Sequence, residues 1–220
     1  MKFILTLLIL SLGACSSSNK RSDLYKNFSE LQKNEDSKNY SIETKKRKSD
    51  VLVLAPHGGR IEYGTTDIAK SLAGKKWSYY AFNGKLKEGN FRLHITSHNF
   101  DEPKALEMVG EHEVCITIHG YKSELSDPNI CFGGRNDELG NRIHTSLRKL
   151  GLQNTDEFNG CARFYGQNEN NIVNRCELEG VQMELSKSFR EELLKSNKTR
   201  RRFNKAIHAA VKQYLSEAHQ

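Results

Sequence analysis

The feature that most constrains the fold is an uninterrupted apolar run that ends abruptly in a polar, glycine-rich loop. The run covers Val51–Leu54, and residues 50–62 read DVLVLAPHGGRIE. Apolar residues without polar alternation are typical of a strand that is buried on both faces, as in a parallel sheet. A proline and two glycines then end the strand. The pattern therefore places His57 at the carboxyl end of a central strand, with Glu62 five residues later.

A second buried-strand pattern, EVCITI, covers Glu113–Ile118 and also ends in a histidine followed by a glycine, His119–Gly120. Strand and helix patterns alternate along the rest of the chain. This alternation predicts a single α/β domain with a mixed, mostly parallel central sheet and helices on both faces. Functional sites in such sheets lie at the carboxyl ends of the strands, so His57 and His119 are expected to meet there.

The remaining patterns predict ten further elements. We expect helices over Thr65–Leu72, Phe100–Val109, Asp137–Leu150, Lys187–Lys195 and Thr199–Ala218. We expect strands over Trp77–Phe82, Phe91–Thr96, Ile130–Phe132, Ala162–Tyr165 and Gly180–Leu185. Acidic residues or proline at the start, and glycine after the end, mark several of these helices.

The amino terminus has the pattern of an export signal. A lysine and a ten-residue apolar core, Phe3–Leu12, precede Gly13-Ala14-Cys15. The core is too short to span a bilayer comfortably, and the small residues before a cysteine resemble the lipobox of bacterial lipoproteins. We therefore predict a signal peptide over 1–14, lipidation at Cys15, a tether over 15–48 and a folded domain over 49–220. The lipid alone would hold the domain at the bacterial cell envelope, facing the periplasm or the exterior. An ordinary cleaved signal with an incidental cysteine is the alternative.

Charge and cysteine content limit the classes of partner and the cellular compartment that are compatible with the chain. The chain has 220 residues and a formal charge of +7, which suits a polyanionic substrate or an anionic surface. Nucleic acid is not expected as a partner, because no nucleic-acid motif occurs. An exported chain can form disulfides. Four cysteines would remain after the signal peptide, Cys115, Cys131, Cys161 and Cys176, and they allow three full pairings. We expect Cys115 to be a core residue. Among the possible disulfides, the pair Cys161–Cys176 is our first candidate.

The two strand-end histidines and the following glutamate suit a metal ion. Catalytic zinc commonly takes three ligands from His and Glu and leaves a position for water, so His57, Glu62 and His119 form a candidate group. His94 and His98 remain rival ligands, because spacing alone does not exclude them. The loop His57-Gly58-Gly59 is also similar to an esterase oxyanion loop. No G-x-S-x-G motif occurs, however, which argues against a serine hydrolase.

Several motifs in matching order resemble the phage poly-γ-glutamate hydrolases. The motifs are Ala55–Gly59 with Ile61-Glu62 and Gly64-Thr65, Leu93–Ser97, Phe100–Pro103, Ile118–Gly120, Gly133-Gly134, Asn171–Arg175 and Gly180–Ser186. The resemblance implies a zinc-dependent hydrolase with a fold related to zinc carboxypeptidases. It also implies that His57, Glu62 and His119 are the metal ligands and that Glu184 is the general base. Alternation independently puts Glu184 inside a strand, where a carboxylate is costly unless it is paired or functional.

The resemblance implies a substrate with one free α-carboxylate per residue, an anionic γ-glutamyl polymer. Arginine forks bind carboxylates, so we expect Arg175 and Arg135 to grip the substrate, followed by Arg60 and Arg190. Asn174 with Arg175 is similar to the carboxylate-binding Asn-Arg pair of zinc carboxypeptidases. We expect a monomer. Two alternatives remain: a zinc amidase or peptidase acting on cell-wall peptides, and a non-catalytic surface lipoprotein that binds polyanions. The sequence does not distinguish endo from exo cleavage.

Overall fold

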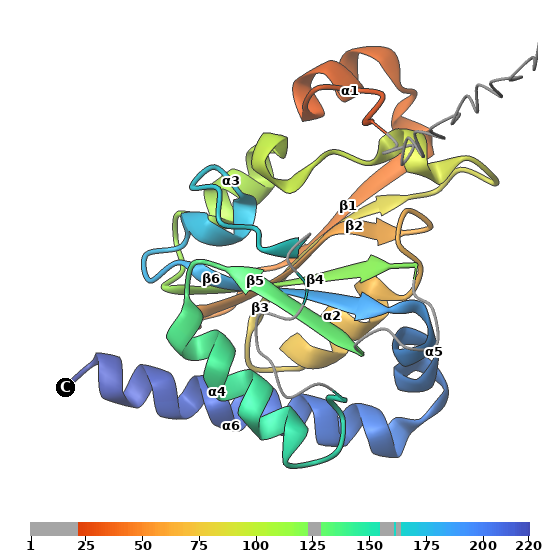
Figure 1. Cartoon of the computed structure of the whole chain (residues 1–220). Coiled ribbons are helices and arrows are strands. Elements are labelled where there is room, and N and C mark those ends of the chain that lie inside the picture. The colour runs from red at the N-terminus through yellow and green to blue at the C-terminus, as the bar shows by residue number, and fades with distance from the viewer. Residues whose placement is uncertain (1–21, 123–128, 155–160, 162–163) are drawn as a thin grey trace, which may run out of the picture.

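A central sheet of six strands organises the part of the chain that the structure describes (Figure 1). The computed structural model describes residues 22–122, 129–154, 161 and 164–220. The strands are β1 Tyr40–Lys45, β2 Val51–Gly59, β3 Ser78–Gly84, β4 Val114–Tyr121, β5 Ile130–Gly134 and β6 Gly180–Ser186. They lie in the order β1, β3, β2, β4, β6, β5 across the sheet.

The direction of the strands confirms the mixed, mostly parallel sheet. The inner strands β3, β2, β4 and β6 pair in parallel, whereas β1 and β5 pair antiparallel at the two edges. In the inner strands the register places Leu54 beside Thr117 and His119 beside Glu184. The carboxyl ends of β2, β4 and β6 therefore meet at one edge of the sheet, as predicted for His57 and His119.

Helices cover both faces of the sheet, as the alternating pattern predicted. The helices are α1 Phe28–Asn34, α2 Thr65–Ala73, α3 Pro103–Val109, α4 Asp137–Arg148, α5 Lys187–Lys195 and α6 Asn197–Ala218. Figure 1 shows α2, α4, α5 and α6 on one side, where they enclose the larger apolar core with Val53, Ile116 and Met183. On the other side lie α1, α3 and the 3-10 turns Ser37–Asn39, Asn90–Leu93, Ser97–Asn99 and Ile172–Arg175.

The predicted tether over residues 15–48 is wrong for the portion that the structure describes. Tyr40 begins β1, which pairs with β3 at the edge of the sheet. In α1, Phe28 and Leu31 are buried, and the Phe28 ring makes edge contacts with Tyr40 and Phe82. The polar composition predicted a tether, but a few well-spaced aromatic residues are enough to dock a short segment on the domain. The folded domain therefore begins upstream of residue 49. The predicted signal peptide over 1–14 and Cys15 lie outside the described residues.

The predicted strand over Phe91–Thr96 is also wrong. Residues Asn90–Leu93 form a 3-10 turn, and His94 follows with extended backbone outside the sheet. The alternating pattern arises because Leu93 and Ile95 are buried under the sheet face while their neighbours are not. A loop that lies flat on a core produces the same alternation as a strand. Residues 162 and 163 of the predicted strand Ala162–Tyr165 lie outside the described residues.

Two disulfides connect strands of the sheet to segments outside it. The bonds are Cys115–Cys176 and Cys131–Cys161, so the pairing of Cys161 with Cys176 is wrong. Cys115 is fully buried, as expected of a core residue, and it is disulfide-bonded as well. Sequence spacing cannot report which cysteines face each other across strands.

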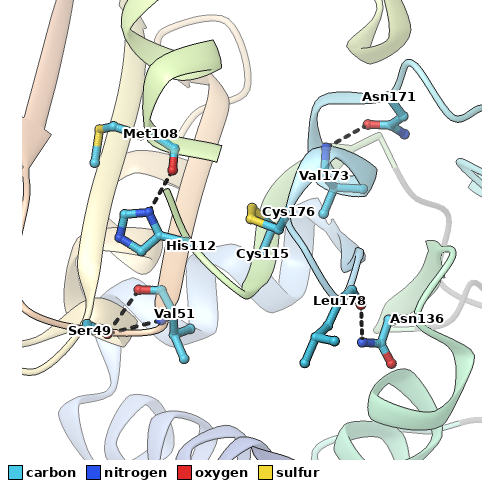
Figure 2. The surroundings of a disulfide bond; sticks show 10 residues. All are labelled: Ser49, Val51, Met108, His112, Cys115, Asn136, Asn171, Val173, Cys176 and Leu178. Atoms are coloured by element: carbon cyan, nitrogen blue, oxygen red, sulfur yellow. Dashed lines mark hydrogen bonds between the residues drawn. A yellow bond between two sulfur atoms is a disulfide. The ribbon is translucent and has the colours of Figure 1, made fainter. Parts of the chain in front are cut away.

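Figure 2 shows the surroundings of the Cys115–Cys176 bond, which joins β4 to the segment after the 3-10 turn Ile172–Arg175. The side chain of Asn171 accepts a hydrogen bond from the Val173 amide at 3.2 Å and starts this turn. The Cys115–Cys176 disulfide therefore anchors a segment that extends toward the carboxyl ends of the strands.

None of the helices in the described part of the chain is both long enough and apolar enough to cross a membrane.

Candidate metal centre

The turn that follows β2 brings two of the predicted ligands together. The backbone amide of Glu62 donates to the carbonyl of His57 at 3.0 Å, and Thr65 Oγ1 donates to the carbonyl of Glu62 at 2.9 Å. Gly59 adopts a φ of 64°, in the left-handed region that glycine occupies without strain. The chain therefore folds back sharply, and the Glu62 carboxylate lies beside the His57 ring.

His119 joins this pair from the neighbouring strand β4. His57 Nδ1 lies 3.0 Å from Glu62 Oε1 and 3.0 Å from His119 Nδ1. His119 Nδ1 lies 3.6 Å from Glu62 Oε2. One ligand atom from each residue falls within 4.8 Å of the others, and both histidines are buried. The structure thus brings together the three residues that the sequence singled out.

The protonation pattern of this group fits a metal ion. His57 Nε2 lies 2.7 Å from the carbonyl of Ile95, which only accepts, so this nitrogen carries the proton of the neutral ring. His57 Nδ1 therefore presents a lone pair toward the Glu62 carboxylate and toward His119 Nδ1. His57 Nδ1 and Glu62 Oε1, which are 3.0 Å apart, need a cation or a proton between them. A histidine held by a backbone carbonyl on its other nitrogen is also the usual arrangement of a zinc ligand.

The Glu62 carboxylate is held in its charged form. When a proton rather than a metal ion fills this place, burial opposes the charge of Glu62, but the positive charge of the protonated His57 ring and hydrogen bonds from His119 and His57 outweigh it and lower the pKa of Glu62 well below its ordinary value. The backbone amide of Gly120 donates to Glu62 Oε2 at 2.7 Å and adds to this effect. A carboxylate that stays ionised at any physiological pH is suited to bind a divalent cation.

Glu184 lies in the same cavity, outside the group of three. The cavity has a volume of about 310 Å³ and is lined by His57, Glu62, His119 and Glu184 together with segments 94–98 and 164–171. Glu184 lies beside His119 in the parallel pairing of β6 with β4. Gln182 Nε2 donates to Glu184 Oε1 at 3.1 Å, and the glutamate is only 7% exposed. The structure therefore places a buried carboxylate in the lining of the same cavity as the group of three.

The rival ligand His94 lines the cavity but is bound to a residue that the sequence did not single out. His94 Nδ1 lies 2.6 Å from Asp23 Oδ1, and the His94 ring lies against the His57 ring with centroids 3.9 Å apart. His94 Nε2 is 3.9 Å from Glu62 Oε1, and His94 falls outside the group of three. The other rival, His98, lines the cavity from an exposed position.

Asp23 was missed because it lies in the segment expected to be a tether. Its carboxylate also accepts hydrogen bonds from the amide and the hydroxyl of Thr96, both at 2.6 Å. Burial raises its pKa, but the hydrogen bonds from His94 and Thr96 dominate and lower the pKa to about 2. An aspartate in a polar stretch carries no sequence signal that separates it from its solvated neighbours.

Asp23→Asn is expected to destabilise the fold in a pH-dependent way. Because the folded pKa of Asp23 is below the ordinary 3.8, its contribution is present above pH 3.8 and is lost as the pH falls toward 2. After allowance for partial solvent screening, we expect a loss of about 1 kcal/mol in unfolding free energy at neutral pH. Urea unfolding at pH 7, 4 and 3 measures the difference. Glu88→Gln, at an exposed position, is the control and should match the wild type. A difference that grows below pH 4 would contradict this account.

The predicted substrate-binding residues are not brought to the cavity. Arg135 forms an ion pair with Glu179 at 2.8 Å, and Arg175 bonds the carbonyl of Asn170 at 3.2 Å on an exposed surface. The amide of Asn174 is used within its own loop, where it donates to the carbonyls at 166 and 168, both at 2.8 Å. The three residues lie outside the lining of the cavity. Arg60 bonds the carbonyl of residue 86 and is also outside it.

Comparison with known proteins decides the family. The profile of the poly-gamma-glutamate hydrolase family matches residues 25–217 of the chain. The chain belongs to the poly-gamma-glutamate hydrolase family. This match begins within the segment expected to be a tether, in agreement with the position of α1 and β1.

Individual relatives and solved structures agree with this placement. The chain is 40% identical to the UPF0714 protein YndL of Bacillus subtilis over 198 residues, which is 88% of this chain and 75% of YndL. A structure of zinc-free YndL superposes with a TM-score of 0.77 at 38% identity, over 87% of this chain and 98% of that one.

A bacteriophage poly-gamma-glutamate hydrolase superposes with a TM-score of 0.81 at 32% identity, over 89% of this chain and 99% of that one. An N-acetylmuramoyl-L-alanine amidase of Clostridium difficile has a TM-score of 0.50 at 13% identity, over 77% and 98% of the two chains, which shows a shared fold alone.

Proposed function

We propose that the protein is a zinc-dependent hydrolase that cleaves γ-glutamyl amide bonds of poly-γ-glutamate. The observation that carries the proposal is the placement of the buried His57 and His119 and the half-buried Glu62 in one cavity with Glu184. Membership of a hydrolase family supports the reaction class. The zinc-free state described for the relative YndL supports zinc as the metal.

Different residues would bind the metal, transfer the proton and position the reacting groups. His57, Glu62 and His119 would hold the metal through the two Nδ1 atoms and the carboxylate. Zinc bound there supplies polarisation of the amide carbonyl and a water with a pKa of about 7. Glu184 accepts a proton from the attacking water and returns it to the leaving nitrogen. Gln182 holds Glu184 Oε1, and the carbonyl of Ile95 fixes the ring of His57.

We expect the substrate to be drawn to the protein by charge. The formal charge of +7 favours association with a polymer that carries one carboxylate per residue. We propose that the enzyme acts as a monomer, without nucleic acid, and that lipid on Cys15 holds it at the bacterial cell envelope. The apolar core and small residues before Cys15 support the anchor.

Depolymerisation of poly-γ-glutamate tests the proposal. The purified protein is incubated with the polymer, and the chain length is followed by size-exclusion chromatography. We expect shortening that stops on chelation and returns with zinc. Poly-α-glutamate, which has the same charge but a different amide linkage, is the matched control and should remain intact. An unchanged γ-linked polymer in the presence of zinc would contradict the proposal.

A cell-wall amidase is the second candidate, because the zinc hydrolase chemistry would be the same. The likeness to an N-acetylmuramoyl-L-alanine amidase concerns the fold alone. Incubation with peptidoglycan fragments separates the two: release of peptide from these fragments, with the γ-linked polymer left intact, would favour the amidase.

A further inference from the structure

A buried arginine behind the metal centre bonds three separate backbone segments. Arg190 lies on α5, and its Nε donates to the carbonyl of Tyr63 at 2.9 Å. Its Nη1 donates to the carbonyl of Tyr121 at 3.3 Å and also to the carbonyl of Leu185. The side chain does not line the cavity, so it does not meet a substrate there. The guanidinium therefore acts on the protein backbone.

The three carbonyls have one property in common. Each belongs to a residue within two positions of a proposed ligand or of the proposed base: Tyr63 follows Glu62, Tyr121 lies two residues after His119, and Leu185 follows Glu184. These residues come from the turn after β2, from β4 and from β6. One guanidinium thus bonds the three segments that carry Glu62, His119 and Glu184.

The contact with β4 is close enough to exclude a side chain. A Cβ added to Gly120 would lie 2.2 Å from Arg190 Nη1 and 2.4 Å from its Cζ. The amide of Gly120 also donates to Glu62 Oε2 at 2.7 Å. Gly120 therefore lies between the guanidinium and the Glu62 carboxylate, and a shift of Arg190 moves both neighbours.

The geometry requires arginine in particular. A guanidinium presents five N–H donors in a rigid planar fork, whereas a lysine ammonium is a single point with three rotating donors on a flexible stem. A lysine at 190 preserves the charge near Glu62 and Glu184 but cannot reach carbonyls on three segments at once. This difference separates the role of the fork from the role of the charge.

We propose that Arg190 is a positioning residue that sets the spacing of Glu62, His119 and Glu184. The inference rests on the proposed metal-dependent function. Residues that orient metal ligands typically contribute about 10- to 100-fold in metal affinity. Arg190 acts in this way through the backbone of three segments, without contact with the metal or the substrate.

Zinc affinity of Arg190→Lys tests the proposal. The affinity is measured by competition with a chromophoric chelator, together with the melting temperature of the metal-free protein. We expect a loss of about 10- to 100-fold in zinc affinity and a fall in kcat, with a folded metal-free protein. Arg47→Lys is the matched control, because Arg47 is half-buried and donates to the carbonyls of Trp77 and Gly74 away from the site. It should retain the affinity of the wild type.

A second variant keeps the test decisive if Arg190→Lys fails to fold. Gly120→Ala leaves the arginine in the chain and displaces it by the added methyl, so we expect a comparable loss of zinc affinity. In the double variant the two losses should not add, because they disturb the same contact. Wild-type zinc affinity in Arg190→Lys or in Gly120→Ala would overturn the inference. A wild-type protein that binds no zinc would instead overturn the proposed function.

Discussion

Glu184→Gln is expected to lower kcat on poly-γ-glutamate by about 10²- to 10⁴-fold, with KM little changed. The amide has the shape of the carboxylate and leaves Gln182 in place beside it. It cannot, however, accept a proton from water. Zinc affinity should remain that of the wild type, because Glu184 lies outside the group formed by His57, Glu62 and His119. Steady-state kinetics and chelator competition on the same preparation measure both quantities.

Glu179→Gln is the matched control for this variant. Glu179 lies just before β6 on the same stretch of sequence, but its carboxylate faces Arg135 outside the cavity. We expect it to retain wild-type kcat. A Glu184→Gln enzyme that turns over at the wild-type rate, or that loses zinc in proportion to its activity, would remove Glu184 from the role of base.

His119→Ala is expected to abolish stoichiometric zinc binding and, with it, hydrolysis. The variant removes one of three acceptors, so the loss in zinc affinity should exceed the roughly 10- to 100-fold that is typical of residues that only orient ligands. Zinc that binds the folded wild type at 100 times its Kd adds about 2.7 kcal/mol of stability, and this gain should vanish in the variant. Metal analysis and thermal unfolding with and without zinc measure these effects.

His98→Ala is the control for the loss of a ligand. His98 lines the same cavity from an exposed position and lies outside the group of three. It should keep the zinc content and the zinc-dependent rise in melting temperature. If His98→Ala lost zinc while His119→Ala retained it, the assignment of ligands would have to be exchanged.

Metal-free wild type gives a further comparison within the same experiment. Without a cation, the lone pairs of His57 Nδ1 and the Glu62 carboxylate face each other at 3.0 Å. Acceptors at this distance repel each other unless a proton is taken up. The wild type should therefore gain more stability from zinc than any variant that lacks one of the acceptors.

The sequence predicted the elements that carry the site because their patterns are local. The apolar run Val51–Leu54 and the run before His119 became adjacent parallel strands, and their histidines meet at the carboxyl edge as expected. Alternation placed Gln182 and Glu184 on one face of β6, where the two side chains bond each other. For these residues, strand periodicity and the rule of strand ends were sufficient.

Patterns failed where burial arises from docking between distant segments. Polar residues surround Phe28 and Leu31, so the composition of this segment predicted a tether, although both residues are buried. The pairing of Cys115 with Cys176 depends on which segments cross over β4, information that spacing does not contain. The position of Arg135 was hidden for the same reason: it lies outside the cavity, where its guanidinium pairs with Glu179.

The sequence by itself predicted the α/β fold and the candidate group His57, Glu62 and His119, because strand periodicity and chain turns are properties of neighbouring residues, but spacing left His94 and His98 as rivals. Only the tertiary structure decided that Asp23 holds His94 and that Arg190 bonds the carbonyls beside three site residues. These contacts join residues more than 60 positions apart in most cases, and the backbone carbonyls that accept the bonds of Arg190 leave no pattern in the sequence of side chains. The candidate ligands and the candidate base could therefore be predicted from the sequence, whereas the contacts made by Asp23 and Arg190 became evident only in the folded structure.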